Sequence, residues 1–387
     1  MTLWTPDLKS DGFLPRDTLS IDEVLYEFDG PLIFNGKFGP LNCLFLRVKD
    51  IGSKQIYLAA EMKEGVVRSL KEGNLSVFGA MGADDYWLVA LEHSVPHIEY
   101  WRVSRPDIPE RFFPASGSGL YHWHGLVPDS LSQAEGLLSI KYEGASLADD
   151  GMPFGKLKSL VDQSYSTMRR LLAPISLLNS RYTTFDIEVA PLEFSSLIIS
   201  AKAPVINAGA LKRSDAGIDA SQARKEFYDR ADQVATKLSD FKSLRDSRSF
   251  SAQYAADNFS FLSLLLDVLP KDDGFLSRTE INARSHGKVS VLTFTRAEAA
   301  EIRDAVKVAT SRQITEIGTV GGYIEKSHTL RFRSPRGKEV TSKFKVREFE
   351  QLTSNPKFRN GAQIRLTGRL TVRQKIDFLD VHSYDLI

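Results

Sequence analysis

Short apolar runs separated by glycine and aspartate turns fill the first part of the chain. From about Val24 to Val103 these runs are VLYEFDG, PLIFNG, LNCLFLRV, KQIYLAAEM, DDYWLVALE and HIEYWRV. Runs of this kind, rich in β-branched and aromatic residues, are typical of strands joined by hairpins. The stretch EGVVRSLKEGNLSVFGAM has room for one short helix. We therefore predict an α+β domain with a mainly antiparallel sheet over residues 1–103.

Residues 104–153 have a different composition. The stretches RPDIPERFFPASGSG and GASLADDGMPFG are rich in Pro, Gly, Ser and Asp, which interrupt regular structure. We expect a linker or an extended docking segment here, with GLLSIKYEG as a strand within it.

Apolar positions then recur at intervals of three and four, as they do on one face of an amphipathic helix. One stripe covers 157–175 and a second covers 227–241, with Asp219 or Ser221 as its candidate N-cap. A third apolar stretch, 252–269, is nearly apolar all round at its end and predicts a deeply buried helix.

Three strand-like runs, TTFDIEVA, SSLIIS and GKVSVLTFT, are interspersed among these helices. Thr295 and Glu298 form a capping box at the start of AEAAEIRDAVKVAT, which predicts a further helix. The pattern predicts a helical α+β middle domain over 154–311. If the protein forms a homo-oligomer, we expect these helices to mediate it.

The last part of the chain alternates in short strands. The runs are ITEIGTVGGYIE, HTLRFRS, EVTSKFKVR, QIRLTGRLTVR and FLDVHSYDLI, with glycine at bends. Five strands of this length predict a small β-barrel of OB-like or SH3-like form over residues 312–387.

Charge distinguishes this predicted barrel from the rest of the chain. The whole chain has a net charge of +1, yet 310–375 contains fifteen basic residues and five acidic ones. Because strand side chains alternate between faces, the cations should lie outside and their apolar neighbours inside, which predicts one strongly positive face. The residues that we predict to make the contact are Arg331, Arg333, Lys343, Lys345, Arg365, Arg369 and Arg373.

This basic face has three readings that the sequence leaves open. It fits phosphate backbones, where each bound cation releases a counterion, or an acidic protein surface. Exposed strands also carry Lys and Arg simply to stay solvated and to discourage edge pairing. Base stacking calls for exposed aromatics. We expect Phe332, Phe344 and Phe378 to point inward, which leaves Tyr323 as the exposed platform.

The number of cysteines and the length of the apolar runs argue against disulfide-bonded, cysteine–zinc and membrane-spanning proteins. The single cysteine, Cys43, rules out an internal disulfide and a cysteine-based zinc site. The start of the chain does not read as a signal peptide. The longest apolar run, FLSLLLDVLP, is too short to span a bilayer. We expect a cytoplasmic protein without a membrane partner.

One pattern fits an enzyme. Asp50, Glu61 and Lys63 resemble the acidic pair and lysine with which metal-dependent nucleases hold Mg²⁺ and steady the attacking water. His122 and His124, in YHWHG, would share one face of a strand and are weak candidates for metal ligands, because no third ligand can be named from spacing. We find no phosphate-cradling loop and no nucleophile elbow.

The stretches VLYEFDGPLIFNGKFGPLNCLFLRV, IYLAAEM and SLKEGNLSVFGAM resemble a domain of uncharacterised bacterial proteins. The predicted helical middle and terminal five-stranded barrel are similar to the same multi-domain family. The resemblance implies no activity, cofactor or catalytic residue. It implies a bacterial accessory protein, with a role in defence against phages or mobile elements.

Together these patterns favour a binding protein without catalysis or cofactor of its own, in which the basic barrel contacts nucleic acid or an acidic protein. The alternatives are the Mg²⁺-dependent nuclease and a purely structural protein-interaction subunit.

Overall fold

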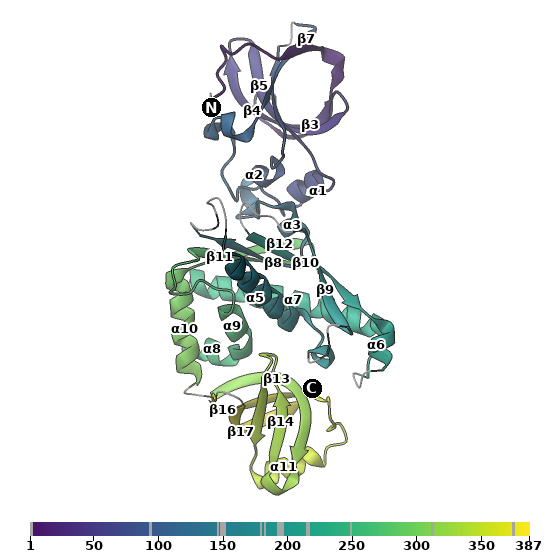
Figure 1. Ribbon diagram of the computed structural model, residues 1–387, viewed down its shortest axis with the longest axis vertical. Coiled ribbons are helices and arrows are strands. Elements are labelled where there is room, and N and C mark those ends of the chain that lie inside the picture. The colour runs from purple at the N-terminus through teal and green to yellow at the C-terminus, as the bar shows by residue number, and fades with distance from the viewer. Residues whose placement is uncertain are drawn as a thin grey trace. The chain divides into compact units, whose positions relative to one another are not determined.

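The fold is mixed α+β, with antiparallel sheets and a closed five-stranded barrel in the C-terminal region (Figure 1). This computed structural model describes the chain except residues 1–2, 93–94, 145–146, 148–151, 179, 182, 192–196, 214–216, 248–249, 311–312 and 374–375. The chain folds into two compact units. The first contains Met1–Glu135 and Gly287–Val291, and the second contains Gly136–His286 and Leu292–Ile387. The expected domain boundaries after residues 103, 153 and 311 stay predictions.

The first unit is built on a seven-stranded antiparallel sheet of order β1-β7-β6-β5-β4-β3-β2. The strands are β1 (Gly12–Pro15), β2 (Leu19–Glu27), β3 (Pro31–Phe38), β4 (Leu41–Ile51), β5 (Lys54–Glu61), β6 (Tyr86–Leu91) and β7 (His97–Val103). The helices are α1 (Val66–Lys71), α2 (Val77–Ala80) and α3 (Leu131–Glu135). Short 3₁₀ turns lie at Arg16–Thr18, Arg105–Asp107, Glu110–Phe112 and His122–His124.

This sheet is curled. Its two edge strands, β1 and β2, are joined only by the 3₁₀ turn Arg16–Thr18, which spans at most about 14 Å. A flat sheet of this size would separate its edges by about 29 Å. The strands therefore bend into the ring seen in Figure 1. Side chains from all seven strands meet in one cluster, in which Phe34 stacks on Phe45 with ring centroids 4.5 Å apart.

Cys43 belongs to this cluster and is fully buried. Burial, and secondarily the negative charge of Glu61, raises the pKa of the Cys43 thiol to about 12. Because only the thiolate attacks disulfide reagents, we expect the folded protein not to react with such a reagent at pH 8. Denaturant should expose one reactive thiol, measured by absorbance of the released chromophore. Rapid reaction in native buffer would contradict this burial.

A five-stranded sheet of order β12-β11-β8-β10-β9 lies in the second unit, except that Lys288–Val291 of β12 are assigned to the first unit. The strands are β8 (Leu138–Glu143), β9 (Phe185–Val189), β10 (Leu197–Ile206), β11 (Arg278–Ser285) and β12 (Lys288–Thr295). The helices are α5 (Phe154–Leu172), α6 (Ala208–Lys212), α7 (Ala220–Asp246), α8 (Ala252–Asp257), α9 (Phe259–Leu266) and α10 (Arg296–Thr310), with a 3₁₀ turn at Ile175–Leu177. The strand expected within 104–153 is thus β8, at the centre of the sheet.

Local sequence signals explain where these helices begin. The Asp219 carboxylate accepts a hydrogen bond from the Gln222 N–H at 2.8 Å, so Asp219 rather than Ser221 caps α7. Glu298 accepts a hydrogen bond from the Thr295 N–H at 2.7 Å, which confirms the predicted capping box. The apolar stripe of α7 packs into the core of its own unit, and self-association through these helices stays a prediction.

The C-terminal barrel closes in the order β13-β14-β15-β17-β16. Its strands are β13 (Gln313–Ile324), β14 (Thr329–Arg333), β15 (Glu339–Lys343), β16 (Gln363–Thr371) and β17 (Asp377–Leu386), with a 3₁₀ turn at Glu325–Ser327 and α11 (Val346–Thr353) between β15 and β16. β15 and β17 are parallel and the other pairs are antiparallel. Inward positions such as Leu330, Phe332 and Leu366 are fully buried, as the alternation predicts.

Two predicted inward positions of the barrel are wrong. Phe378 is half-buried on the outward register, because its neighbour Asp377 takes the inward place and is fully buried. Val372 is 53% exposed because β16 ends one residue before it, at Thr371.

A buried ion network explains why Asp377 points inward. The Arg336 guanidinium donates to both Glu316 and Asp377, whose carboxylates are fully buried. Burial lowers the pKa of Arg336, but the two carboxylates outweigh it and leave that pKa raised. Ser260 of α9 donates to Glu316 at 2.8 Å, and Arg336 lies over the Phe259 ring, 5.1 Å from its centroid. The network therefore ties the barrel to α9 within the second unit.

Within the described part of the chain, no helix combines the length and the apolar character needed to cross a bilayer.

Candidate anion-binding site

The seven predicted contact cations all lie on the outside of the barrel and are exposed. Arg331 and Arg333 are on β14, Lys343 is on β15 and Lys345 follows it. Arg365 and Arg369 are on β16, which β13 separates from β14, and Arg373 follows β16. The cations therefore form two groups rather than the single positive face that the sequence predicts. The first group is Arg331, Arg333, Lys343 and Lys345, and the second group is Arg365, Arg369 and Arg373.

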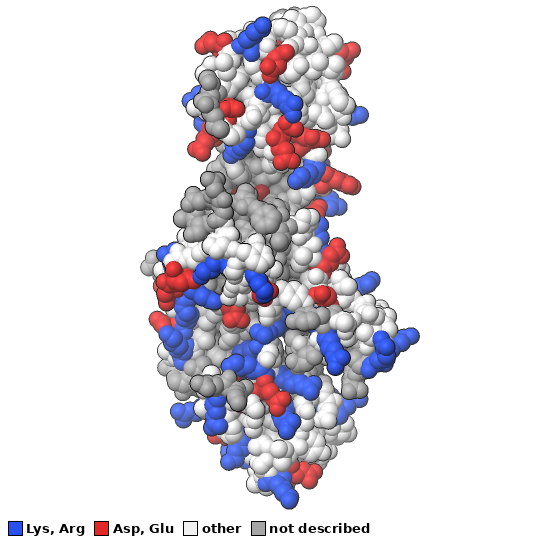
Figure 2. All heavy atoms as spheres, in the orientation of Figure 1, with Lys and Arg blue, Asp and Glu red and all other residues white. Residues whose placement is uncertain are grey.

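Some of these cations have nearby carboxylates. Arg331 lies 3.7 Å from Glu339 and Lys345 lies 3.9 Å from Glu348, both as exposed pairs that contribute little binding energy of their own. Within the described residues, Arg333, Lys343 and Arg369 have no carboxylate oxygen within 4.0 Å. On the neighbouring strands, Glu339 lies opposite Arg333, and Asp380 lies opposite Lys343 and Arg369. Figure 2 shows Lys and Arg side chains gathered over the lower part of the second unit, with fewer Asp and Glu between them.

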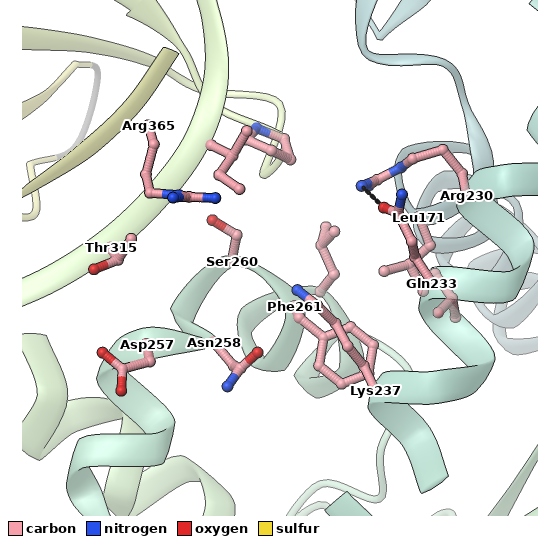
Figure 3. A pocket seen from close by; sticks show the side chains of 14 residues that line it. Leu171, Arg230, Gln233, Lys237, Asp257, Asn258, Ser260, Phe261, Thr315 and Arg365 are labelled. Carbon is pink, nitrogen blue, oxygen red and sulfur yellow. Dashed lines mark hydrogen bonds between the residues drawn. The ribbon is translucent and has the colours of Figure 1, made fainter. Parts of the chain in front are cut away.

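The second group borders a pocket that the sequence did not reveal. The pocket has a volume of about 270 Å³ and lies between α7, α9 and the outer face of β13 and β16. Arg230 and Lys237 reach into it from α7, and Arg365 reaches into it from β16 (Figure 3). Asp257 is the one acidic residue among its lining residues. The pocket therefore has a net positive charge.

Arg230 is the most confined of these cations. Its Nη1 donates to the Gln233 side-chain oxygen at 3.3 Å, whereas its Nε is buried and has no hydrogen-bond partner within the described residues. Burial lowers the pKa of Arg230. An unmet donor on a buried guanidinium costs free energy until an acceptor arrives. Arg230 therefore places a confined positive charge at the wall of the pocket.

Lys237 lies seven residues, or about two helical turns, after Arg230 on the same face of α7. Although the residue is exposed overall, its ammonium group lies over the Phe261 ring, 5.6 Å from the centroid. Burial of that group, and secondarily the positive charge of Arg230, lowers the pKa of Lys237. Neither Lys237 nor Arg230 has a carboxylate within 4.0 Å in the described part of the chain. Two cations that repel each other without a counterion favour the entry of an anion.

Arg365 and Asp257 complete the charges of the pocket. Arg365 lies 3.5 Å from Asp385, but both side chains are well exposed and the pair is weak. Asp257 is exposed and accepts a hydrogen bond from Gln253 at 3.0 Å. Leu171, Val234 and Leu264 supply apolar walls. This combination of converging cations and apolar walls has the chemistry that suits phosphate or carboxylate groups.

The residues of the alternative nuclease site are not brought together. Asp50 pairs with Gln55 across β4 and β5, whereas Glu61 pairs with Cys43 at the other end of the same two strands. Six residues of strand separate the two carboxylates, a distance of about 20 Å. Asp50 is already held by the Arg47 guanidinium, which lowers the pKa of that carboxyl group. Lys63 follows β5 at the Glu61 end and is exposed.

His122 and His124 do not share a strand face, because His122–His124 forms a 3₁₀ turn. The His124 ring packs closely against two glycines. Gly73 and Gly119 leave room for the His124 ring, and a Cβ added at Gly73 would lie 2.7 Å from its Cγ. Burial, and secondarily the charge of Lys288, lowers the pKa of His124. No cluster of three or more His, Cys, Asp or Glu suited to a metal ion occurs among the described residues.

Comparisons with known proteins give no match to a family model, to a curated protein or to a solved structure. The fold and the site must therefore be interpreted from their own physical chemistry.

Proposed function

We propose that this protein binds nucleic acid through the basic outer surface of its C-terminal barrel. The observation that carries the proposal is the presence of exposed cations on adjacent strands, Arg333 on β14 and Lys343 on β15, that have no carboxylate oxygen within 4.0 Å in the described part of the chain. Such cations gain free energy by replacing condensed counterions on phosphates.

The strand topology of the barrel also supports nucleic-acid binding. Its strand order, with β15 and β17 parallel and α11 between the third and fourth strands, favours the OB-like form over the SH3-like form. OB barrels bind oligonucleotides on the face of their second and third strands and with the loops after the first and fourth. Here the second and third strands are β14 and β15, which carry the first group of cations.

Aromatic side chains near these loops add stacking surfaces. Tyr323, at the end of β13, is 46% exposed and packs on Phe358 with ring centroids 5.3 Å apart. Phe378 is half-buried on the outside of β17, and the Arg373 guanidinium lies over its ring, 5.6 Å from the centroid. Base stacking on such rings is sequence-tolerant. Single-stranded nucleic acid is therefore the favoured ligand.

The test is binding of labelled single-stranded and double-stranded DNA and RNA to the full chain across a salt series. We expect single strands to bind, with log Kd changing steeply with log salt. The combined variant Arg333→Gln, Lys343→Gln and Arg369→Gln should reduce that slope by about 2 for single strands. At about 1 kcal/mol per exposed ionic contact, it should weaken binding roughly 100-fold.

A matched control removes cations of the first unit that are also exposed. The combined variant Lys37→Gln, Lys49→Gln and Arg68→Gln changes the net charge of the chain equally. It should bind as the original protein does. Equal loss in both combined variants would mean that only net charge matters. If no nucleic acid binds at low salt, the proposal fails, and an acidic protein surface becomes the partner to seek.

A further inference from the structure

We propose that the pocket formed by Arg230, Lys237 and Arg365 binds the terminal phosphate of a nucleic acid strand. The inference rests on the proposed function and adds a separate role to it. The strand cations of β14 and β15 hold the internal backbone, whereas the pocket recognises an end.

The charge of the pocket favours a terminal phosphate over an internal one. Three cations and one carboxylate line the pocket, which gives a net charge of about +2. A phosphate monoester has a charge of about −1.5 to −2 at pH 7, whereas each internal phosphodiester has a single negative charge. The monoester therefore neutralises the pocket more completely. It also offers three terminal oxygens to the converging donors.

The donors of the pocket match those oxygens. Arg230 presents a planar guanidinium at the wall of the pocket, and Lys237 contributes a point charge from two turns further along α7. Guanidinium groups bind phosphate oxygens in a bidentate fashion. Figure 3 shows that Arg365 approaches from the barrel, opposite the two α7 cations. A phosphate between them would contact both α7 and β16.

The size of the pocket sets a limit on what enters. Its volume is about 270 Å³. This is enough for a phosphate with its sugar but below the range of about 300–1,000 Å³ that drug-sized ligands need. Leu171, Val234 and Phe261 provide the apolar walls against which a sugar can pack. The rest of the strand must lie outside, where the barrel cations are.

The experiment compares one oligonucleotide with a 5′-phosphate, with a 3′-phosphate and with hydroxyl groups at both ends. Fluorescence anisotropy with the full chain gives each Kd. We expect one of the phosphorylated forms to bind about tenfold tighter, as one added charge-assisted contact allows. The double variant Arg230→Gln and Lys237→Gln should abolish this preference, so that all three forms bind with the same Kd.

The matched control is the double variant Arg224→Gln and Lys225→Gln. Both residues are exposed on the same helix and do not line the pocket, so the preference should persist. Thermal unfolding provides the check on folding. Because Arg230 and Lys237 are confined cations without described carboxylate partners, their replacement should leave the midpoint unchanged or raise it.

The outcomes separate this inference from the proposed function. Binding of all forms with equal affinity overturns the pocket but keeps the barrel, whereas no binding at all rejects the barrel as well. A preference that survives in the Arg230 and Lys237 double variant places end recognition elsewhere. A nucleoside monophosphate that binds as tightly as the phosphorylated strand would make the small molecule, and not a strand end, the ligand.

Discussion

The Arg336→Met protein should lose about 3–5 kcal/mol of unfolding free energy, because the substitution leaves two buried carboxylates without their shared cation. Arg336 is 9% exposed at its side chain, and its partners Glu316 and Asp377 are fully buried. The remaining partners do not replace it, since Lys338 lies 3.7 Å from Asp377 and is 41% exposed. Denaturant titration followed by circular dichroism measures the loss.

The control for this variant is Arg331→Met. Arg331 belongs to the same barrel but is 60% exposed, and its pair with Glu339 is long at 3.7 Å. We expect a change of about 0–1 kcal/mol. A loss of similar size in both variants would show that the apolar replacement, and not the broken network, is responsible. No loss for Arg336→Met would mean that the ion network does not stabilise the barrel.

The second large effect is expected for Gly368→Ala in β16. A Cβ at this position would lie 2.1 Å from the Asp380 carbonyl oxygen of β17, so the two strands must separate. Gly368 follows a shift of register between β16 and β17, where the barrel bends. Because the obstacle is backbone and not a flexible side chain, we expect a loss of about 3 kcal/mol, the upper end for overpacking.

Gly155→Ala in α5 serves as its comparison. No heavy atom lies within 4 Å of a Cβ added at Gly155. Alanine favours the helical backbone over glycine by up to about 1 kcal/mol, so the variant should be as stable as the original or more stable. Thermal and denaturant unfolding of both proteins decide the matter. If Gly368→Ala unfolds like Gly155→Ala, β16 and β17 are further apart than described.

The parts of the fold that could be predicted are those governed by local rules. Alternation of polar and apolar residues predicts the outward cations of the barrel, and the capping box at Thr295 predicts the start of α10. The sequence pattern does not predict the first part of β2, before Val24. The side chains there, including Ile21, are mostly exposed and do not follow the two-residue period of a half-buried strand. The alternation of polar and apolar residues also does not predict that Asp377 points inward, because its ion-pair partner Arg336 is distant in sequence.

The site shows the same division. Arg331, Arg333 and Lys343 are visible in the sequence because one strand rule places each of them outside. Arg230 and Lys237 look like ordinary solvated residues of a long helix. The fold brings them into one pocket with Phe261 of α9 and Arg365 of β16, a grouping of distant parts of the chain that no local pattern encodes.

The path of the chain between the two units has a further consequence. Gly287–Val291 belongs to the first unit although it lies far from Met1–Glu135 in sequence. The buried Asn74 side chain donates to the Gly287 carbonyl at 2.7 Å and accepts from the Val289 N–H at 3.0 Å. A fragment that stops at Glu135 would remove both of these bonds and leave Asn74 its bond to Glu72. The first unit is therefore not one contiguous stretch of the chain, and a fragment ending at Glu135 would lack part of it.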